Sequence, residues 1–318
     1  AWREWMELRH LRHFVAVVEA GNLSRASEAA FLSQPALTRS IHSLEEIVGA
    51  QLFERHAKGV SPTAAGRTLY DYAGFILNQC AKARAEVGAV GGREQRSIAL
   101  ACAAMFADFV VDKAGAELAA AFPDHAITLT TGFFEDLIEQ VVDGRLDAMF
   151  SNIPTGHLVP EGLTVERILD VRTVLVAHAD HPMAAGRTAA LRGDRAAARW
   201  AIVQQPHMHA WLTQFFAAEG LAPPASVIET NSLDMIRALL LRGGCVGLLP
   251  EHLVRAELRK GLLKRLPAEA PVLRKAGLIY RADAIMRPAL AQFLRSVRRH
   301  CAIESGLETM KAEEAAIG

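Results

Sequence analysis

The chain has 318 residues, of which 51% are hydrophobic and 22% charged, and its acidic and basic side chains balance. This length exceeds one typical domain and predicts two or three. Zero net charge gives no ground for a general affinity for polyanions, so any nucleic-acid binding must come from a local arrangement of side chains. The four cysteines lie far apart without a CxxC pair, which argues against a disulfide framework or a zinc site.

No run of about 18 apolar residues is present, so we expect no membrane span. The first ten residues, AWREWMELRH, are charged and do not have the apolar core of a signal peptide. Both observations predict a cytoplasmic protein.

Two short helices are predicted at the start of the chain. Apolar residues recur three and four apart from Leu8 to Val18, and Gly21 ends this first helix. Asn22 is a good N-cap for a second helix, which a break at Phe31 separates from a third.

The third helix, Gln34–Val48, has two distinct sides. Its apolar side is formed by Leu37, Ile41, Leu44 and Val48. A separate side is polar and free of acidic residues, and it carries Gln34, Pro35, Thr38, Arg39 and His42. Amide, hydroxyl and guanidinium groups are those that contact base edges and phosphates in a major groove. The alternative is an ordinary surface helix, because helix-turn-helix patterns in a single sequence are weak signals.

A basic hairpin is predicted directly after this helix. Gln51–Glu54 is expected to form a short strand, and His56–Val60 a turn. Such a wing could reach the DNA backbone beside the inserted helix. Arg55, Lys58 and Thr63 are candidates for phosphate contact, and Thr63 is also the expected N-cap of the next helix.

The next helix, residues 64–90, has an apolar period of 3.5 residues, which is typical of a coiled-coil seam. A seam predicts a homodimer that places two reading helices on two DNA half-sites. The alternative is a helix that packs inside its own chain. The predicted seam consists of Leu69, Ala73, Ile76, Cys80, Ala83 and Val87.

These segments resemble the N-terminal winged helix-turn-helix of the LysR-type transcriptional regulators. The resemblance rests on SQPALTRSIHSLE and LFERHAKGVSPTAAG, and extends more loosely over the rest of the chain. Ser40 and His42 stand where the family more often has longer amide or basic side chains. The resemblance implies that Arg55 and the wing lie at phosphate, and that the residues facing DNA are Ser33, Gln34, Pro35, Ala36, Thr38 and Arg39.

After a hinge at 91–96, short apolar runs alternate with helices. This order predicts an α/β region with a largely parallel sheet and helices on both faces. Helices are expected at Phe106–Phe122, Phe133–Val142, His209–Glu219, Ser232–Arg242 and Met286–Cys301. Two α/β subdomains with a cleft between them follow, and the resemblance implies a similarity to periplasmic solute-binding proteins.

In open α/β sheets, ligands bind outside the carboxyl ends of strands. The resemblance assigns these ends to an effector pocket, although Cys102-Ala103-Ala104 stands where relatives often have a hydroxyl. Few charges and two phenylalanines lie there, which favours a partly apolar and even aromatic effector. The expected effector-binding residues are Cys102, Ala103, Ala104, Thr131, Gly132, Phe133, Asn152, Gln204, His207, Asn231, Val246 and Gly247.

The alternatives are an enzyme and a solute-binding protein whose N-terminal domain serves only protein contact. No GxSxG, GxxxxGK[ST] or GxGxxG motif is present. His207 and His209 do not have the i, i+4 spacing of a metal pair. Cys102 and Cys245 are more typical of small buried hydrophobes than of redox sensors. We expect no catalytic or metal site and no cofactor.

The sequence therefore predicts a DNA-binding transcriptional regulator controlled by a small-molecule effector. Its expected partners are double-stranded DNA, the effector and further copies of itself, as a homodimer through the linker helix and a homotetramer. The expected divisions are a DNA-binding domain at 6–63, a dimerisation helix at 64–90, a hinge at 91–96, effector subdomain I at 97–164 and 283–303, effector subdomain II at 165–282, and a tail at 304–318.

Overall fold

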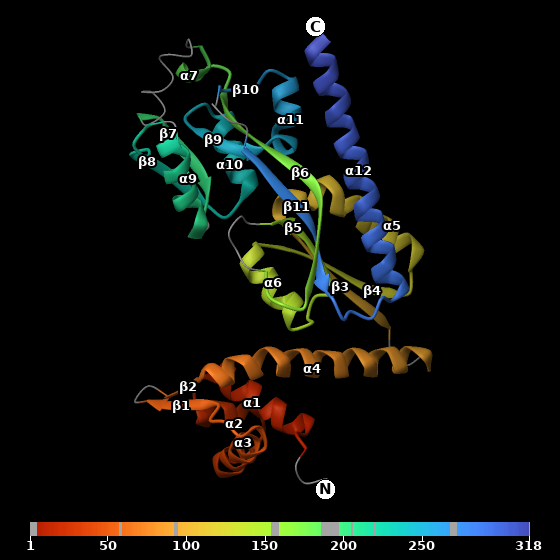
Figure 1. The fold of residues 1–318 in the computed structure, drawn as a ribbon. Coiled ribbons are helices and arrows are strands. Elements are labelled where there is room, and N and C mark those ends of the chain that lie inside the picture. Colours follow the sequence, from red (N-terminus) through yellow and green to blue (C-terminus); the bar gives the residue numbers. More distant parts are fainter. Residues whose placement is uncertain are drawn as a thin grey trace.

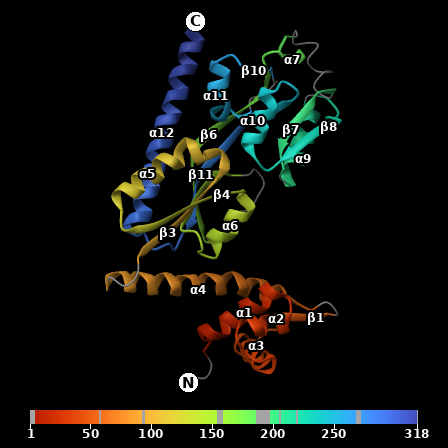
Figure 2. The ribbon, with the colours of Figure 1, turned by 180° about the vertical axis from the view of Figure 1, so that it is seen from behind.

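The computed structural model describes residues 5–56, 59–91, 95–153, 159–185, 197–204, 206–218, 220–267 and 272–317. Three parts follow one another along the chain: a helical N-terminal domain, one long helix, and a larger α/β part above that helix (Figure 1). The view from behind shows the same order, with the long helix between the other two parts (Figure 2).

The N-terminal domain is a winged helix-turn-helix. Its elements are α1 (Leu8–Ala20), α2 (Leu23–Ala29), α3 (Gln34–Val48), β1 (Phe53–His56) and β2 (Gly59–Pro62). Asn22 caps α2, since its side chain accepts hydrogen bonds from the backbone N–H groups of Ser24 and Arg25. The predicted bounds of the first and third helices are confirmed.

The turn between α2 and α3 has a left-handed residue that is not glycine. Phe31 has φ 54°, and it follows the C-cap residue Ala30. The N–H groups of Phe31 and Leu32 donate to the carbonyl oxygens of Glu28 and Ser27, respectively. This pair of hydrogen bonds is a Schellman motif, which usually has glycine at this position. The motif fixes the angle at which the chain enters α3.

The long helix α4 (Ala64–Val90) contacts the domains on both sides of it. Leu69, Ala73 and Ile76 belong to or pack against the core of the N-terminal domain, with Ala73 fully buried. Further along, Val87 is 74% exposed. The predicted bounds of this helix are confirmed. The first half of the predicted seam thus contributes to the core of its own chain, and its second half is largely exposed.

The α/β part contains one mixed sheet. Its strands lie in the order β4-β3-β5-β11-β6-β9-β7-β8, with β10 paired to β6. The pairs β3–β4, β3–β5, β7–β8 and β7–β9 are parallel, as predicted, but β6 and β11 are antiparallel to their neighbours. The strands are β3 (Arg96–Ala103), β4 (His125–Gly132), β5 (Ala148–Asn152), β6 (Leu163–His178), β7 (Arg199–Val203), β8 (Ser226–Thr230), β9 (Val246–Pro250), β10 (Leu263–Arg265) and β11 (Val272–Arg281).

Two central strands run through both halves of this sheet. β11 pairs with β6 along its length and with β5 through Ala276–Ile279, whereas β6 pairs with β9 through Thr173–Ala177. Separate apolar cores lie on either side of this crossing. We call the part around β3, β4 and β5 the first half, and the part around β7, β8 and β9 the second half.

Helices cover both halves. The first half has a 3-10 turn (Ala104–Phe106), a π-helical turn (Ala107–Val111), α5 (Asp112–Ala121), α6 (Phe134–Val142) and α12 (Pro288–Ile317). The second half has α7 (Pro182–Ala185), α9 (Pro206–Ala218), α10 (Leu233–Leu241) and α11 (Glu251–Arg259). Four helical features differ from expectation: the π-helical turn interrupts the predicted helix 106–122, α7 and α11 were not predicted, and α12 continues beyond Cys301 through most of the expected tail. Buried residues such as Phe293 and Val297 hold α12 in the core of the first half, against α5.

Candidate nucleic-acid interface and effector cavity

The two sides of α3 are separated as predicted, with one exception. Leu37, Ile41 and Leu44 are buried in the domain core, but Val48 is 41% exposed. On the other side, Ala36 and Thr38 are half-buried, and the exposed residues are Ser33, Gln34, Pro35, Arg39 and His42. The polar side of α3 is therefore a surface of the domain.

The start of α3 favours an anion. Its first turn contains no acidic residue, and the side chain of the N-cap residue Ser33 makes no capping hydrogen bond. Unpaired N–H groups and the helix dipole at an N-terminus attract phosphate. This end of α3 and its exposed Arg39 both favour a negatively charged partner.

Two side-chain contacts fix the position of α3. Glu45 lies on its second half, where Oε1 accepts hydrogen bonds from the backbone N–H groups of Leu52 (2.8 Å) and Phe53 (3.4 Å). Ser40 Oγ lies 2.6 Å from Nδ1 of His13 on α1. Burial, followed by the nearby His10, lowers the pKa of His13, which favours its neutral form. Glu45 thus connects α3 to the wing.

The wing is a two-stranded hairpin in which Arg55 pairs with Val60. The backbone N–H of Val60 donates to the carbonyl oxygen of Gly21, 3.0 Å away, so the wing is attached to the α1–α2 turn. Gly59 permits this approach, since it has φ 138° and any Cβ there would collide with the Gly21 carbonyl. Arg55 is exposed. The predicted phosphate contact at Lys58 lies outside the described residues.

A surface hollow brings the wing and α3 together. Thr38 and His42 of α3 line it with Arg55 of β1. The structure gives Thr63 a different role from these three. Its hydroxyl donates to the carbonyl oxygen of Gln51 (2.8 Å) and accepts from the N–H of Gly66 (3.0 Å). The oxygen of that hydroxyl caps the start of α4, as predicted, while phosphate contact by Thr63 stays a prediction.

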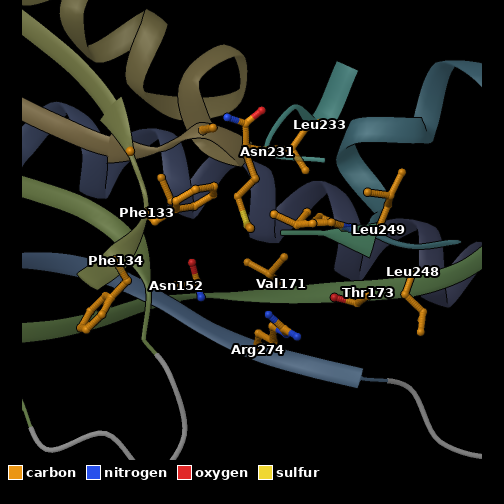
Figure 3. A pocket seen from close by; sticks show the side chains of 16 residues that line it. Phe133, Phe134, Asn152, Val171, Thr173, Asn231, Leu233, Leu248, Leu249 and Arg274 are labelled. Carbon is orange, nitrogen blue, oxygen red and sulfur yellow. The ribbon is translucent and has the colours of Figure 1, made fainter. Parts of the chain in front are cut away.

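A cavity lies between the two halves of the α/β part (Figure 3). The empty space in it is about 800 Å³, a figure that includes the part open to solvent. The first half contributes the end of β3 and the start of α6, and the second half contributes β9 and the start of α10. β6 and β11 form the wall between them.

Half of the predicted effector-binding residues line this cavity. They are Ala103, Ala104, Gly132, Phe133, Asn152 and Asn231. Cys102, Val246 and Gly247 are buried beside it, and burial raises the pKa of the Cys102 thiol to about 12. Thr131 and Gln204 are exposed on the surface. The side chain of His207 lies outside the described residues.

Ten other residues line the cavity and were not predicted. They are Met105, Phe134, Val171, Thr173, Val203, Leu233, Leu248, Leu249, Pro250 and Arg274. Some of them, such as Phe134 and Leu248, lie one or two residues beyond the predicted strand ends. The rule that ligands bind at the carboxyl ends of strands would have included them if it had been applied to a longer segment. Val171, Thr173 and Arg274 lie within strands, and only the pairing of β6 with β11 places them on this wall.

Neither a metal site nor a membrane span was found in the described parts of the chain. No group of three or more His, Cys, Asp and Glu side chains among them could hold a metal ion. Within the same residues, no helix is both long and apolar enough to cross a bilayer.

The fold is similar to that of several solved regulators. ArgP from Mycobacterium tuberculosis matches 93% of this chain and 98% of its own with a TM-score of 0.70 and 21% sequence identity. Full-length CbnR in complex with its target DNA matches 93% of this chain and all of its own, with a TM-score of 0.58 and 24% identity. The likeness in fold thus extends over all three parts of the chain.

Sequence comparisons agree with this likeness. The SDS degradation transcriptional activation protein of Pseudomonas sp. (strain ATCC 19151) is 29% identical over 287 residues, covering 89% of this chain and 92% of that protein. The profile of the bacterial regulatory helix-turn-helix proteins of the lysR family matches residues 8–67, and that of the LysR substrate binding domain matches residues 91–302. The chain therefore belongs to the LysR family, as a DNA-binding transcriptional regulator that a small-molecule effector controls.

Proposed function

We propose that α3 lies in the major groove of the operator and that the wing lies against the adjacent backbone. Gln34 and Arg39 would donate to base edges, with Ser33, Pro35, Ala36, Thr38 and His42 around them. Arg55 would contact phosphate. The observation that carries this proposal is the exposed, acid-free start of α3 beside the Arg55 strand of the wing.

We propose further that two copies pair through the exposed stripe of α4. Tyr72, Ala83, Val87 and Val90 are exposed along this helix. Two positions in every seven residues form the seam of a helix pair, and the small Ala83 permits close approach. Such a dimer presents two copies of α3 to two half-sites, and two dimers would form a homotetramer.

The cavity between the two halves of the α/β part would bind the effector, and this binding would alter the angle between the two halves. A ligand shifts such an equilibrium only by its difference in affinity for the two arrangements. We propose no catalytic activity and no cofactor, since the described cavity lining has no pair of acid and base groups. Because its target is chromosomal DNA, the protein would act in the cytoplasm.

Replacing Arg39 by Ala tests the DNA-reading role of α3. The variant removes one exposed guanidinium from the proposed interface, so we expect operator affinity to fall at least about tenfold at moderate salt. Operator fragments would come from the DNA upstream of the gene and be measured in a gel-shift titration.

Arg242→Ala is the matched control, because Arg242 is also exposed but lies on the second half. It removes the same charge and should leave affinity unchanged. Equal affinities of wild type and Arg39→Ala for the operator would exclude α3 as the reading helix.

A further inference from the structure

Phe31 is an aromatic side chain that the fold leaves in solvent. It is 94% exposed, more than any other large hydrophobic side chain in the described parts of the chain. The next residue, Leu32, packs against the core of the N-terminal domain instead. The ring of Phe31 therefore contributes little to the stability of the domain through burial.

The backbone of Phe31 is also unfavourable for a side chain. Among the described residues, it is the only residue other than glycine with a positive φ, at 54°. Glycine is usual at this position of a Schellman motif, because a Cβ is strained in the left-handed region. Exposure and backbone conformation thus both oppose a phenylalanine here. Backbone strain of this kind persists mainly where a residue serves binding.

Phe31 belongs to the same surface as the start of α3. Ser33, Gln34 and Pro35 are exposed like Phe31, and only the half-buried Leu32 lies between them along the chain. Both views show α3 on the side of the N-terminal domain away from the α/β part (Figure 1, Figure 2). The ring is therefore exposed beside the residues that we propose to enter the major groove.

A duplex that holds the start of α3 in its groove comes within reach of Phe31. An extended chain spans about 3.6 Å per residue, so the Cα atoms of Phe31 and Ser33 are at most about 7 Å apart. The major groove is about 12 Å wide, so a residue at its centre has a sugar–phosphate rim about 6 Å away on each side. The side chain of Phe31 can therefore contact this rim.

The rim offers a phenyl ring two kinds of surface. Its phosphate oxygens are hydrated anions, and the ring of Phe31 has no N–H or O–H group to donate to them. Its deoxyribose rings carry C–H groups, against which an aromatic ring can pack through dispersion and the release of water. A contact with deoxyribose neutralises no phosphate and releases no counterion, in contrast to the phosphate contact proposed for Arg55.

We infer that the ring of Phe31 packs on a deoxyribose at the rim of the major groove and so positions the start of α3 in it. This inference rests on the proposed position of α3 in the groove. Phe31 contributes affinity without reading a base, whereas Gln34 and Arg39 read the base edges.

Phe31→Gly separates binding from folding. Glycine suits φ 54°, so the unfolding temperature of the full chain should remain unchanged or rise by a few degrees. Operator affinity in a gel-shift titration should nevertheless fall about fivefold or more, which corresponds to the loss of a partly buried ring. Phe31→Tyr keeps the ring and should keep the affinity of wild type.

The dependence of affinity on salt identifies the kind of contact. Affinities would be measured from about 50 to 200 mM salt and compared on logarithmic scales. Phe31→Gly should give a line below that of wild type and parallel to it, whereas Arg55→Ala should reduce the slope by about one. Leu262→Ala is the matched control, since Leu262 is an exposed apolar residue of the second half, and it should change neither affinity nor slope.

Three results would overturn the inference. If Phe31→Gly binds as tightly as wild type, or Phe31→Tyr as weakly as Phe31→Gly, the ring does not contact DNA. If Phe31→Gly reduces the salt slope, the lost contact is ionic. If the loss disappears on operator DNA in which uracil replaces thymine, the ring contacts a thymine methyl group and not a sugar.

Two further comparisons separate this inference from effects on the fold and from the proposed function. If Phe31→Gly unfolds at a lower temperature than wild type, Phe31→Asn takes its place, because asparagine also adopts the left-handed conformation. Full affinity in a stable Phe31→Asn would overturn the inference. If Arg39→Ala weakens binding and Phe31→Gly does not, only the inference fails; if neither weakens it, the proposed position of α3 fails as well.

Discussion

Single side chains in the DNA-binding domain divide into those that face outward and those that hold the domain together. The wheel of α3 predicts the outward group correctly, since only geometry within one helix is needed. Thr63 was correctly predicted as the N-cap of α4, but the other contact of Thr63 and those of Glu45 could not be assigned in this way. Their partners are backbone groups of Leu52 and Gln51, and these contacts depend on the path of the chain after α3.

Gly59 provides a prediction at this scale. In Gly59→Ala, the new Cβ would collide with the Gly21 carbonyl, and φ 138° is unfavourable for any residue with a side chain. We expect a loss of about 2 kcal/mol or more in the free energy of unfolding and weaker DNA binding. Thermal unfolding and gel-shift titration would measure both.

Gly244→Ala is a suitable control for this substitution. No atom lies within 4 Å of the position of its Cβ, and its φ is not in the left-handed region. Its effect should stay within about 0.5 kcal/mol. If Gly59→Ala is no less stable than this control, the contact between wing and turn is not required.

Among the elements, α4 shows what a periodic pattern leaves undecided. Its 3.5-residue spacing predicts an apolar stripe, and a stripe is present. The same spacing serves contacts within a chain and between chains, so the sequence could not show that Ala73 is fully buried in its own domain. A charge at Ile76, which packs against that core, would therefore test folding before it tests dimerisation.

The strands β6 and β11 explain why Arg274 was not predicted. Its sequence context, VLRKAGLIY, places two cations in a row, which is typical of a solvated strand end. Only the register of β11 with β6 shows that Arg274 and Lys275 lie on opposite faces of the sheet. The strand ends at Ala103, Asn152 and Asn231 were predicted because parallel strands follow a local rule.

The π-helical turn at Ala107–Val111 connects the two halves through a histidine. His252 at the start of α11 stacks on Phe109, with ring centroids 4.2 Å apart, and its Nε2 donates to the carbonyl oxygen of Met105 (2.7 Å). Burial lowers the pKa of His252, against the opposing effect of that hydrogen bond. Met105 lines the cavity, so this contact adjoins the proposed effector site.

Stability should therefore depend on pH near His252. The pKa of His252 in the folded state lies below its unfolded value of about 6.5. The contribution of neutral His252 to the free energy of unfolding is therefore complete above about pH 6.5, and it decreases as the pH falls through and below that value. Unfolding temperatures between pH 8 and 5.5 would show this decrease, and His252→Gln should show less of it. Asp108, Arg255 and Glu304 also act on His252, and they remain in both proteins. Parallel curves for the two proteins would contradict the prediction.

At the scale of the molecule, α4 connects the N-terminal domain with the α/β part. Lys82 Nζ and an Arg287 guanidinium nitrogen each lie 2.7 Å from Oδ1 of Asp147, and Arg287 also pairs with Glu86 at 2.8 Å. Asp147 directly precedes β5, which ends at Asn152 in the cavity. A movement of β5 would therefore act on α4 through partly buried charges.

Oligomerisation also belongs to this scale. Val87 is 74% exposed, so Val87→Asp should leave the fold intact and place two charges against each other in the proposed dimer. We expect the mass from light scattering to fall from that of an oligomer toward that of one chain, with unchanged circular dichroism. Ala81→Asp, an exposed site on another side of α4, should keep the wild-type mass. An unchanged mass for Val87→Asp would exclude this stripe as the dimer contact.

The crossing of β6 and β11 also limits how such a regulator can be recombined. Each half of the α/β part takes strands from segments far apart in the sequence, and the last helix returns to the first half. A chimeric protein that joins the N-terminal domain and α4 of one regulator to the whole α/β part of another, between α4 and β3, would keep that α/β part and its ligand preference intact. A chimeric protein joined anywhere from β6 to β11 would instead combine strands from two different regulators within one wall of the cavity. We therefore expect that a DNA-binding domain can be made to respond to a different ligand by exchanging the whole α/β part at the junction between α4 and β3.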